Sequence, residues 1–313
     1  MAVLHISSRI AAVALVALVA LDVALVATAL RSTQTPGVDT SPVGAPSASI
    51  DLSSIAAATT SGSSSTSPVT SAGAPLQTML VALDSVRAWR VGAGSCAAGG
   101  ATLATTVDGG KTWADGKVSL QRIVRVRPTD NRAAFIVGAD AACTAKVKDT
   151  SDGGGTWSSG TYVAQTWFRD PKNPLVVRAP GPALSQPCGK GAVLDLAVLT
   201  AGSAQVLCAD GLVRSTTVNG SVWTDVGKVN GAVALAVGTA NAAGTYVARL
   251  GAADCTGVQI LRVGQLVPAS CIRVSIPKDP GQIAMSLIKG GGWLVVGNTT
   301  MRSTDNLVTW KAS

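Results

Sequence analysis

The most informative features of this sequence are absences. None of the 313 residues is a glutamate, and the single histidine is His5, close to the start of the chain. A Ser-His-Asp triad, a Cys-His pair and a His-ligated metal site therefore cannot be built beyond the first few residues. Aromatic residues make up only 4% of the chain, whereas 47% of it is hydrophobic. The apolar content comes mainly from Ala, Val, Leu and Ile, which suits closely packed sheets.

One long hydrophobic run occupies residues 10–30. It is broken only by Asp22 and flanked by Arg9 and Arg31. A helix of this length crosses a bilayer core of ~30 Å at about 1.5 Å per residue. Residues 27–29 also fit the small-x-small rule for signal-peptide cleavage, so an anchor and a cleaved signal both stand as interpretations. Either one places the rest of the chain outside the cytoplasm, and the anchored form leaves residues 1–9 as a cytoplasmic N-terminus.

The next segment, residues 31–76, is rich in Ser, Thr, Ala and Pro. Beyond Arg31 it has no Lys or Arg and few large apolar residues. Such a composition buries too little surface to offset the entropy of ordering the chain, so a disordered linker is expected. A flexible linker of this length has an r.m.s. span of roughly 35 to 40 Å. The sequence therefore predicts a tether that holds residues 77–313 away from the membrane.

Four copies of an eight-residue pattern end in tryptophan: Thr106–Trp113, Thr150–Trp157, a degenerate Thr216–Trp223, and Ser303–Trp310. The recurring residues are Asp108, Gly110 and Trp113; Asp152, Gly154 and Trp157; Asn219 and Trp223; and Asp305 and Trp310. Asp oxygens accept hydrogen bonds from turn amides, Gly supplies a positive φ, and Trp packs beneath the turn. The pattern resembles the Asp box, or BNR repeat, of sialidase-like β-propellers. The residues are expected to be structural, with each Trp mostly buried under its hairpin.

The apolar stretches around these turns predict a repeating strand architecture. Six units of short β-branched and apolar runs begin near residues 77, 118, 163, 193, 229 and 276, separated by Gly, Asn, Asp and Pro. A spacing of about 40 to 50 residues suits a four-stranded propeller blade. Residues 77–313 are therefore predicted to form an all-β propeller of about six four-stranded blades. The third unit is the least regular because it is short and rich in proline.

Six cysteines lie in the predicted exported part: Cys96, Cys143, Cys188, Cys208, Cys255 and Cys271. An even number outside the cytoplasm predicts three disulfides, although six cysteines allow 15 pairings. Repeat position suggests Cys96 with Cys143 across neighbouring blades and Cys255 with Cys271 within one unit, which leaves Cys188 with Cys208. No C-x-x-C pair and no nearby His points to a metal. No metal or other cofactor is expected.

The resemblance to sialidases implies a scaffold, while their catalytic set is missing. Those enzymes use a Tyr activated by Glu, and this chain has only Tyr162 and Tyr246 and no Glu. Residues 168–171, Phe-Arg-Asp-Pro, resemble the Phe-Arg-Ile-Pro signature, but they follow two of the repeats instead of preceding them. Seven aspartates outside the repeats leave a paired-Asp glycosidase open: Asp84, Asp140, Asp170, Asp195, Asp210, Asp254 and Asp279. The pattern is also similar to that of photosystem II assembly-factor propellers, which bind proteins.

The sequence therefore favours a non-enzymatic, membrane-tethered propeller that binds a protein or glycan partner outside the cytoplasm. The alternative is a carbohydrate-active hydrolase or lyase that uses Asp residues at the propeller mouth. Residues 77–313 carry 23 Lys or Arg against 14 Asp, with basic residues alternating in 124–127 and 146–148. This charge indicates an anionic cell-envelope polymer or an acidic protein as partner. Nucleic acid is not expected, because stacking aromatics are few and export removes the usual partner.

Overall fold

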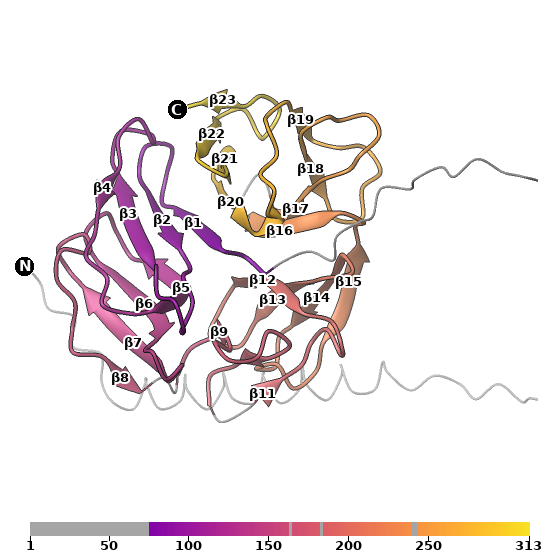
Figure 1. Cartoon of the computed structure of the whole chain (residues 1–313). Coiled ribbons are helices and arrows are strands. Elements are labelled where there is room, and N and C mark those ends of the chain that lie inside the picture. Colours follow the sequence, from indigo (N-terminus) through magenta and orange to yellow (C-terminus); the bar gives the residue numbers. More distant parts are fainter. Residues whose placement is uncertain (1–74, 163–164, 182–183, 239–242) are drawn as a thin grey trace, which may run out of the picture. The chain divides into compact units, whose positions relative to one another are not determined.

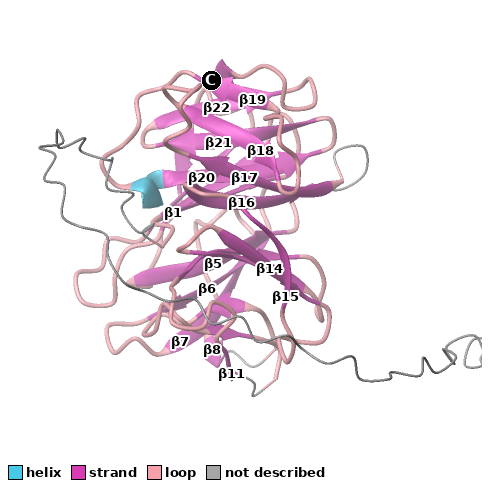
Figure 2. Cartoon of the chain, turned by 90° about the vertical axis from the view of Figure 1, so that its right-hand side faces the viewer, coloured by secondary structure: helices cyan, strands magenta, loops and turns pink. Residues whose placement is uncertain are grey.

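A computed structural model describes residues 75–162, 165–181, 184–238 and 243–313 (Figure 1). The predicted cytoplasmic segment, hydrophobic run and most of the linker lie outside these residues. Within the described part, no helix is both long enough and apolar enough to cross a membrane. Its one helix is a short 3-10 turn, Pro280–Gln282, just before strand β20 (Figure 2).

Six antiparallel sheets make up the described part, and each is formed by consecutive strands. The first blade contains β1 (Thr78–Ala82), β2 (Ala88–Gly92), β3 (Thr102–Thr106) and β4 (Ala114–Asp115), and the second contains β5 (Arg122–Pro128), β6 (Ala134–Ala139), β7 (Ala145–Thr150) and β8 (Thr161–Tyr162). The third contains β9 (Phe168–Arg169), β10 (Val177–Arg178) and β11 (Leu184–Ser185). The fourth contains β12 (Val193–Val198), β13 (Ala204–Cys208), β14 (Leu212–Thr216) and β15 (Thr224–Lys228). The fifth contains β16 (Ala232–Gly238), β17 (Gly244–Arg249), β18 (Val258–Arg262) and β19 (Ser270–Ile272), and the sixth contains β20 (Ile283–Ile288), β21 (Gly291–Val296), β22 (Thr299–Ser303) and β23 (Lys311–Ala312).

These sheets are the blades of a six-bladed propeller, as the sequence predicted. The first strand of each four-stranded blade lies at the centre, where β1 packs against β5 and β20, and β16 packs against β12 and β20. No strand is exchanged between the first and last blades, since β20–β23 all come from the C-terminal segment. The ring is closed by side-chain packing of β1 on β20 and by hydrogen bonds near residue 76.

The third blade departs from the prediction because it has three strands. Trp167 precedes β9 and donates its indole N–H to the carbonyl of Ala201, in the first turn of the next blade (2.7 Å). The turn after β9 lies at the other end of the blades, where the carbonyl of Pro174 accepts from the amide of Val193 (2.8 Å). Strand β9 therefore runs opposite to the innermost strands of the other blades. Prolines in this segment cannot donate ladder hydrogen bonds, which limits strand length.

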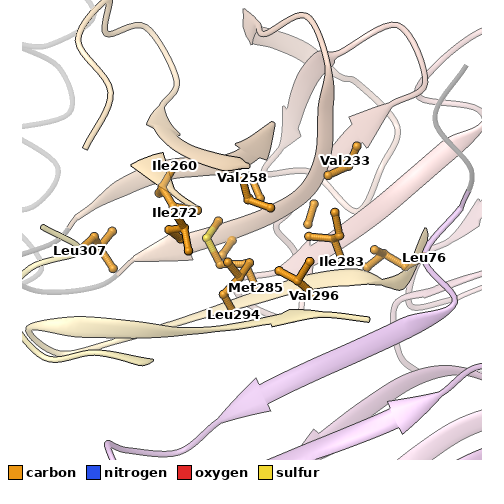
Figure 3. Close-up of a cluster of buried hydrophobic side chains, with 13 residues drawn as sticks. Leu76, Val233, Val258, Ile260, Ile272, Ile283, Met285, Leu294, Val296 and Leu307 are labelled. Carbon is orange, nitrogen blue, oxygen red and sulfur yellow. The ribbon is translucent and has the colours of Figure 1, made fainter. Parts of the chain in front are cut away.

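The hydrophobic core lies between neighbouring blades. Aliphatic side chains of the fifth and sixth blades, such as Ile260, Ile283 and Leu294, fill the space between the two sheets (Figure 3). Leu76 joins this cluster at the centre of the ring. Small buried residues on the innermost strands, such as Ala236 and Ala284, allow the sheets to approach closely near the axis, where a ring has least room.

The alternation of strand directions gives the propeller two distinct faces. In the four-stranded blades, the turns between the first and second strands and between the third and fourth strands lie at one end. The four eight-residue repeats form turns of the second kind, so this end is named the repeat face. Loops that carry all three disulfides lie at the opposite end, named the disulfide face. Residue 75, where the described part begins, enters on the disulfide face, beside the loop after β2.

Candidate functional site

Three repeat turns share one hydrogen-bond pattern. In the first, the Thr106 hydroxyl donates to an Asp108 carboxylate oxygen (2.8 Å) and accepts from the Gly110 amide (3.0 Å). The amide and hydroxyl of Thr112 both donate to Asp108. The turns at Asp152 and Asp305 repeat these contacts. These hydrogen bonds, led by that from the Thr112 hydroxyl, lower the pKa of Asp108 to about 2. The three carboxylates, Asp108, Asp152 and Asp305, therefore stabilise their turns through these hydrogen bonds.

The degenerate third copy differs from the expectation for Asn219. Counting from Thr216, Val218 takes the place of Asp108, and Asn219 takes the place of Gly109, with a φ of 54°. The amides of Val218 and Gly220 still donate to the Thr216 hydroxyl (3.3 and 3.2 Å), but the contacts to a carboxylate are lost. Asn is among the residues that tolerate the left-handed conformation. Asn219 therefore shapes the backbone and does not substitute for the carboxylate.

The four repeat tryptophans pack against the core and are only partly exposed, so each is mostly buried, as the sequence analysis expected. A different set is fully buried: Trp89, Trp167 and Trp293. Each of these donates its indole N–H to a carbonyl in the first turn of the next blade, namely Asp130, Ala201 and Asp84 (3.1, 2.7 and 2.8 Å). Two of them also pack edge-on against repeat tryptophans, Trp293 on Trp113 and Trp167 on Trp223. The sequence analysis did not identify this set, because the three tryptophans lie outside the four repeats.

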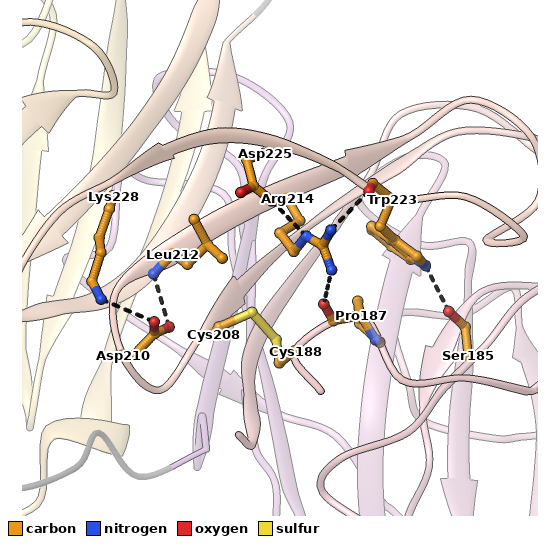
Figure 4. Close-up of a disulfide and its surroundings, with 10 residues drawn as sticks. All are labelled: Ser185, Pro187, Cys188, Cys208, Asp210, Leu212, Arg214, Trp223, Asp225 and Lys228. Carbon is orange, nitrogen blue, oxygen red and sulfur yellow. Dashed lines mark hydrogen bonds and ion pairs between the residues drawn. A yellow bond between two sulfur atoms is a disulfide. The ribbon is translucent and has the colours of Figure 1, made fainter. Parts of the chain in front are cut away.

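All six cysteines are paired as predicted. Cys96–Cys143 joins the first and second blades, with Cα atoms 5.3 Å apart. Cys188–Cys208 joins the exit of the third blade to the fourth (5.5 Å), and Cys255–Cys271 closes a loop within the fifth (5.7 Å). Figure 4 shows the second bridge beside Arg214, which donates to the carbonyls of Pro187 and Trp223 and pairs with Asp225. The third blade, which has the fewest strands, is thereby tied to its neighbour.

A cavity of about 350 Å³ occupies the centre of the ring. It is lined by the innermost strands. At the disulfide-face end Leu76 lies across it, with its amide donating to the carbonyl of Leu194 (3.1 Å). At the repeat-face end its rim includes the exposed side chains of Arg127 and Leu199. The central cavity is therefore closed by the incoming chain on one side and has its mouth on the repeat face.

Arginine is the main charged residue in the central cavity. Arg169 is buried near the closed end and donates to the carbonyl of Leu194 (2.6 Å). Arg125 is half-buried between the second and third blades, where it donates to the carbonyl of Trp167 (2.6 Å). Burial, with a smaller contribution from neighbouring Arg127, lowers the pKa of Arg125 to about 10, so it remains charged at pH 7. Arg127 makes no hydrogen bond or ion pair through its side chain within the described residues, which leaves it available to a ligand.

The basic residues noted in the sequence do not form one continuous patch. Arg125 and Arg127 lie on the innermost strand of the second blade, whereas Lys146 and Lys148 lie on its third strand. Lys146 pairs with Asp140 (3.2 Å), and Lys148 donates to Ser119 (2.9 Å). Of the four, Arg127 alone presents an unpaired charge at the central cavity.

One carboxylate, Asp195, lines the central cavity. Its oxygens accept from the amides of Leu196 and Leu235 (2.7 and 2.8 Å), so it bridges the fourth and fifth blades. Burial raises its pKa, although the positive charge of Arg169 and these amides oppose the rise.

The six other aspartates that the sequence analysis named serve turns, ion pairs or an amide contact, and none of them lines the central cavity. Asp84, Asp140, Asp170 and Asp210 pair with Arg87, Lys146, Arg178 and Lys228, Asp279 caps the amide of Gly281, and Asp254 accepts from Gln259. Tyr246 packs against the hydrophobic core between the fifth and sixth blades. In the described part of the chain, no three His, Cys or Asp side chains gather as a metal site would require.

A second cavity, of about 640 Å³, lies on the disulfide face above Leu76. Backbone of glycine-rich loops forms much of its wall, and its polar side chains include Arg122, Gln282 and Asn298. The Nε atom of Arg122 is buried without a partner there. None of the residues that line this cavity is a carboxylate.

Comparison with known proteins gives no family. No protein-family model matches the chain, and no curated protein matches it. Among solved structures, it is similar to YCF48 bound to D1 peptide (21% identity, 75% of this chain and 68% of that chain, TM-score 0.30). It is also similar to the SapL1 lectin in complex with alpha methyl fucoside (13%, 76% and 95%, 0.45) and to the GH74 xyloglucanase from Xanthomonas campestris (14%, 75% and 38%, 0.31). All three TM-scores are below 0.5, so the fold assignment depends on the strand topology described above.

Proposed function

We propose that this chain is a non-enzymatic binding propeller, held outside the cytoplasm by its N-terminal segment, which takes an acidic protein partner at the mouth of the central cavity. The observation that carries the proposal is Arg127, an exposed and unpaired cation at the mouth of the central cavity. The other side chains around this mouth are mainly apolar. These include Val198, Leu199, Val237 and Leu287. A cation within an apolar rim suits a protein segment with an acidic group beside hydrophobic side chains.

The rest of the repeat face supports a protein partner. Several of its turns expose apolar side chains: Val86, Val107, Val218, Val222, Leu266, Val267 and Val308. Exposed apolar groups of this kind are typical of protein contact surfaces when they gather on one face. The chain enters on the opposite face, so a tether attached there would leave the repeat face accessible.

The hydrolase alternative has less support in the central cavity. Glycoside hydrolysis ordinarily uses two carboxyl groups on either side of the scissile bond. Among the described residues that line this cavity, Asp195 is the one carboxylate, and both of its oxygens are already hydrogen-bonded to backbone amides. Release of reducing sugar from envelope polysaccharide by the purified chain would restore this alternative.

Site-specific photo-cross-linking in intact cells tests the proposed partner site. A photoreactive phenylalanine at Leu199, on the cavity rim, is expected to give one discrete cross-linked protein, and the same group at Val226, on an outer strand, is the control. Arg127→Glu should abolish the Leu199 product, because the new carboxylate repels an acidic partner. Equal products from both positions, or a product unaffected by Arg127→Glu, would contradict the proposal. Resistance of the chain to alkaline extraction from membranes checks the tether separately.

A further inference from the structure

A groove separates the outer parts of the fifth and sixth blades, away from the central cavity. It has a volume of about 530 Å³. One wall is formed by Cys271, Ile272 and Arg273, at and just after β19, and the other by Met301 of β22 and the turn Val308–Trp310. Asp254 lies at the disulfide-face end.

The fourth repeat differs from the first and third repeats in its aromatic contacts. Trp113 and Trp223 each pack edge-on against a fully buried tryptophan of the preceding blade, with ring centroids 6.5 and 6.1 Å apart. The fifth blade, which precedes Trp310, contains no tryptophan. The half-buried ring of Trp310 packs against the core between the fifth and sixth blades and also lines the groove.

Two hydrogen bonds fix the orientation of Trp310, and one of them reaches Ser270 of β19. Its indole N–H donates to the Ser270 hydroxyl (2.9 Å) and to the carbonyl of Leu307 (3.2 Å). With the N–H engaged, the ring offers the groove carbon edges and a π surface. The neighbouring Thr309 is also committed, because its amide and hydroxyl both donate to Asp305.

Polar groups are available at the ends of the groove. Arg273 is exposed and, within the described residues, its side chain makes no ion pair or hydrogen bond. Asp254 is exposed and accepts only long contacts from the Gln259 amide (3.2 and 3.3 Å). A rigid aromatic ring with an unpaired guanidinium and an exposed carboxylate that keeps acceptor capacity matches a sugar chain, which presents C–H faces for stacking and hydroxyls that both accept and donate.

A peptide fits the groove less well. Peptides usually enter such places by adding a strand to a sheet edge. The available edge, β19, is only three residues long, and its central residue, Cys271, is held in a disulfide. It offers too few main-chain groups for a strand to pair with.

We propose that the groove between the fifth and sixth blades is a carbohydrate-binding site for a linear, uncharged oligosaccharide. One pyranose ring stacks on Trp310, and Arg273 and Asp254 bind hydroxyls of neighbouring units. This site is separate from the mouth of the central cavity. The two proposals are therefore independent, and each can be tested without the other.

Titration of the full-length chain in detergent with cellohexaose and with α-1,6-mannohexaose tests this site, followed by tryptophan fluorescence and calorimetry. At least one hexasaccharide should bind, and Trp310→Ala should weaken it tenfold or more. Arg273→Ala and Asp254→Asn, which change exposed side chains, should each weaken binding several-fold without altering the melting temperature. Trp113→Ala removes the equivalent residue of a packed repeat and should leave the affinity unchanged.

The proposal is overturned if neither sugar binds the wild-type chain. It is equally overturned if binding survives in both Trp310→Ala and Arg273→Ala, since the sugar would then lie elsewhere. Saturable binding of an extended peptide in this groove, with no sugar binding, would identify a peptide site instead. Arg127→Glu should not affect the titration, which separates this site from the central cavity.

Discussion

Trp293 should be the most consequential single side chain for the stability of the propeller. It is fully buried, donates to the carbonyl of Asp84 in the first blade (2.8 Å), and packs edge-on against Trp113. These contacts cross the junction between the last and first blades. Because no strand is exchanged there, the junction depends on side-chain contacts of this kind.

The cost of removing the ring can be worked from these contacts. Truncation of a buried Trp to Ala costs about 3 to 5 kcal/mol. The carbonyl of Asp84 also loses its donor, which adds about 1 kcal/mol or more if it stays buried. At ~2 to 4 °C per kcal/mol for a domain of this size, Trp293→Ala should lower the melting temperature by roughly 8 to 24 °C.

Two variants make the test specific. Trp293→Phe keeps most of the buried area and removes the N–H, so it should cost about 1 to 3 kcal/mol. Trp310→Ala removes a half-buried ring and should cost clearly less than Trp293→Ala. Urea unfolding followed by circular dichroism gives the free energies, and melting curves give the temperatures. If Trp293→Ala were no more destabilising than Trp310→Ala, the assignment of Trp293 as the junction residue would be refuted.

Three further predictions concern the turns and the disulfides. The pKa of Asp108 and that of Asp305 are each lowered to about 2 in the folded chain. The stabilisation that these carboxylates give is therefore complete above the unfolded pKa near 4 and is lost as the pH falls toward 2. The melting temperature should decrease over that pH range, and Asp108→Asn should make this decrease smaller. The bridge Cys96–Cys143 spans 47 residues and Cys255–Cys271 spans 16. Because a longer loop loses more entropy on closure, replacing Cys96 and Cys143 by serine should lower the free energy of unfolding in urea by about 1 kcal/mol more than replacing Cys255 and Cys271. An equal loss for the two pairs would contradict this chain-entropy argument. Leu307 is buried with a φ of 73°. Leu307→Gly should lose about 2 to 5 kcal/mol of packing energy and gain ~1 to 2 kcal/mol from relief of backbone strain, so a net loss of stability is expected. A stabilised variant would show that the strain is the larger of the two.

Much of the fold could be predicted from the sequence because its causes are local. Short apolar runs separated by Gly, Asn and Asp indicate strands and turns, and a period of about 40 to 50 residues gives the blade and the approximate number of blades. Repeat position predicted Cys96–Cys143 across neighbouring blades and Cys255–Cys271 within one unit, and Cys188 with Cys208 was the pair that remained. The third blade was least predictable, because its strands are too short to leave a pattern.

The candidate sites could not be predicted, because they depend on which side chains meet across blades. Arg125 and Arg127 are two residues apart in the same alternating pattern, yet one is committed to a backbone carbonyl of the third blade and the other is free at the central cavity. Trp310 occupies the same repeat position as Trp113, yet Trp113 packs edge-on against Trp293 whereas Trp310 lines a groove.

The sequence by itself determined the strand period, the turn chemistry of the repeats, and the absence of any Glu and of any His after His5, since each depends on residue identity and short spacing. Tertiary structure alone decided the three-stranded third blade, the burial of Trp89, Trp167 and Trp293, the closure of the central cavity by Leu76, and which charges remain unpaired. The physical reason is that burial and pairing are set by contacts between blades. Residues of the last blade and the first are more than 200 positions apart, and only closure of the ring brings them together.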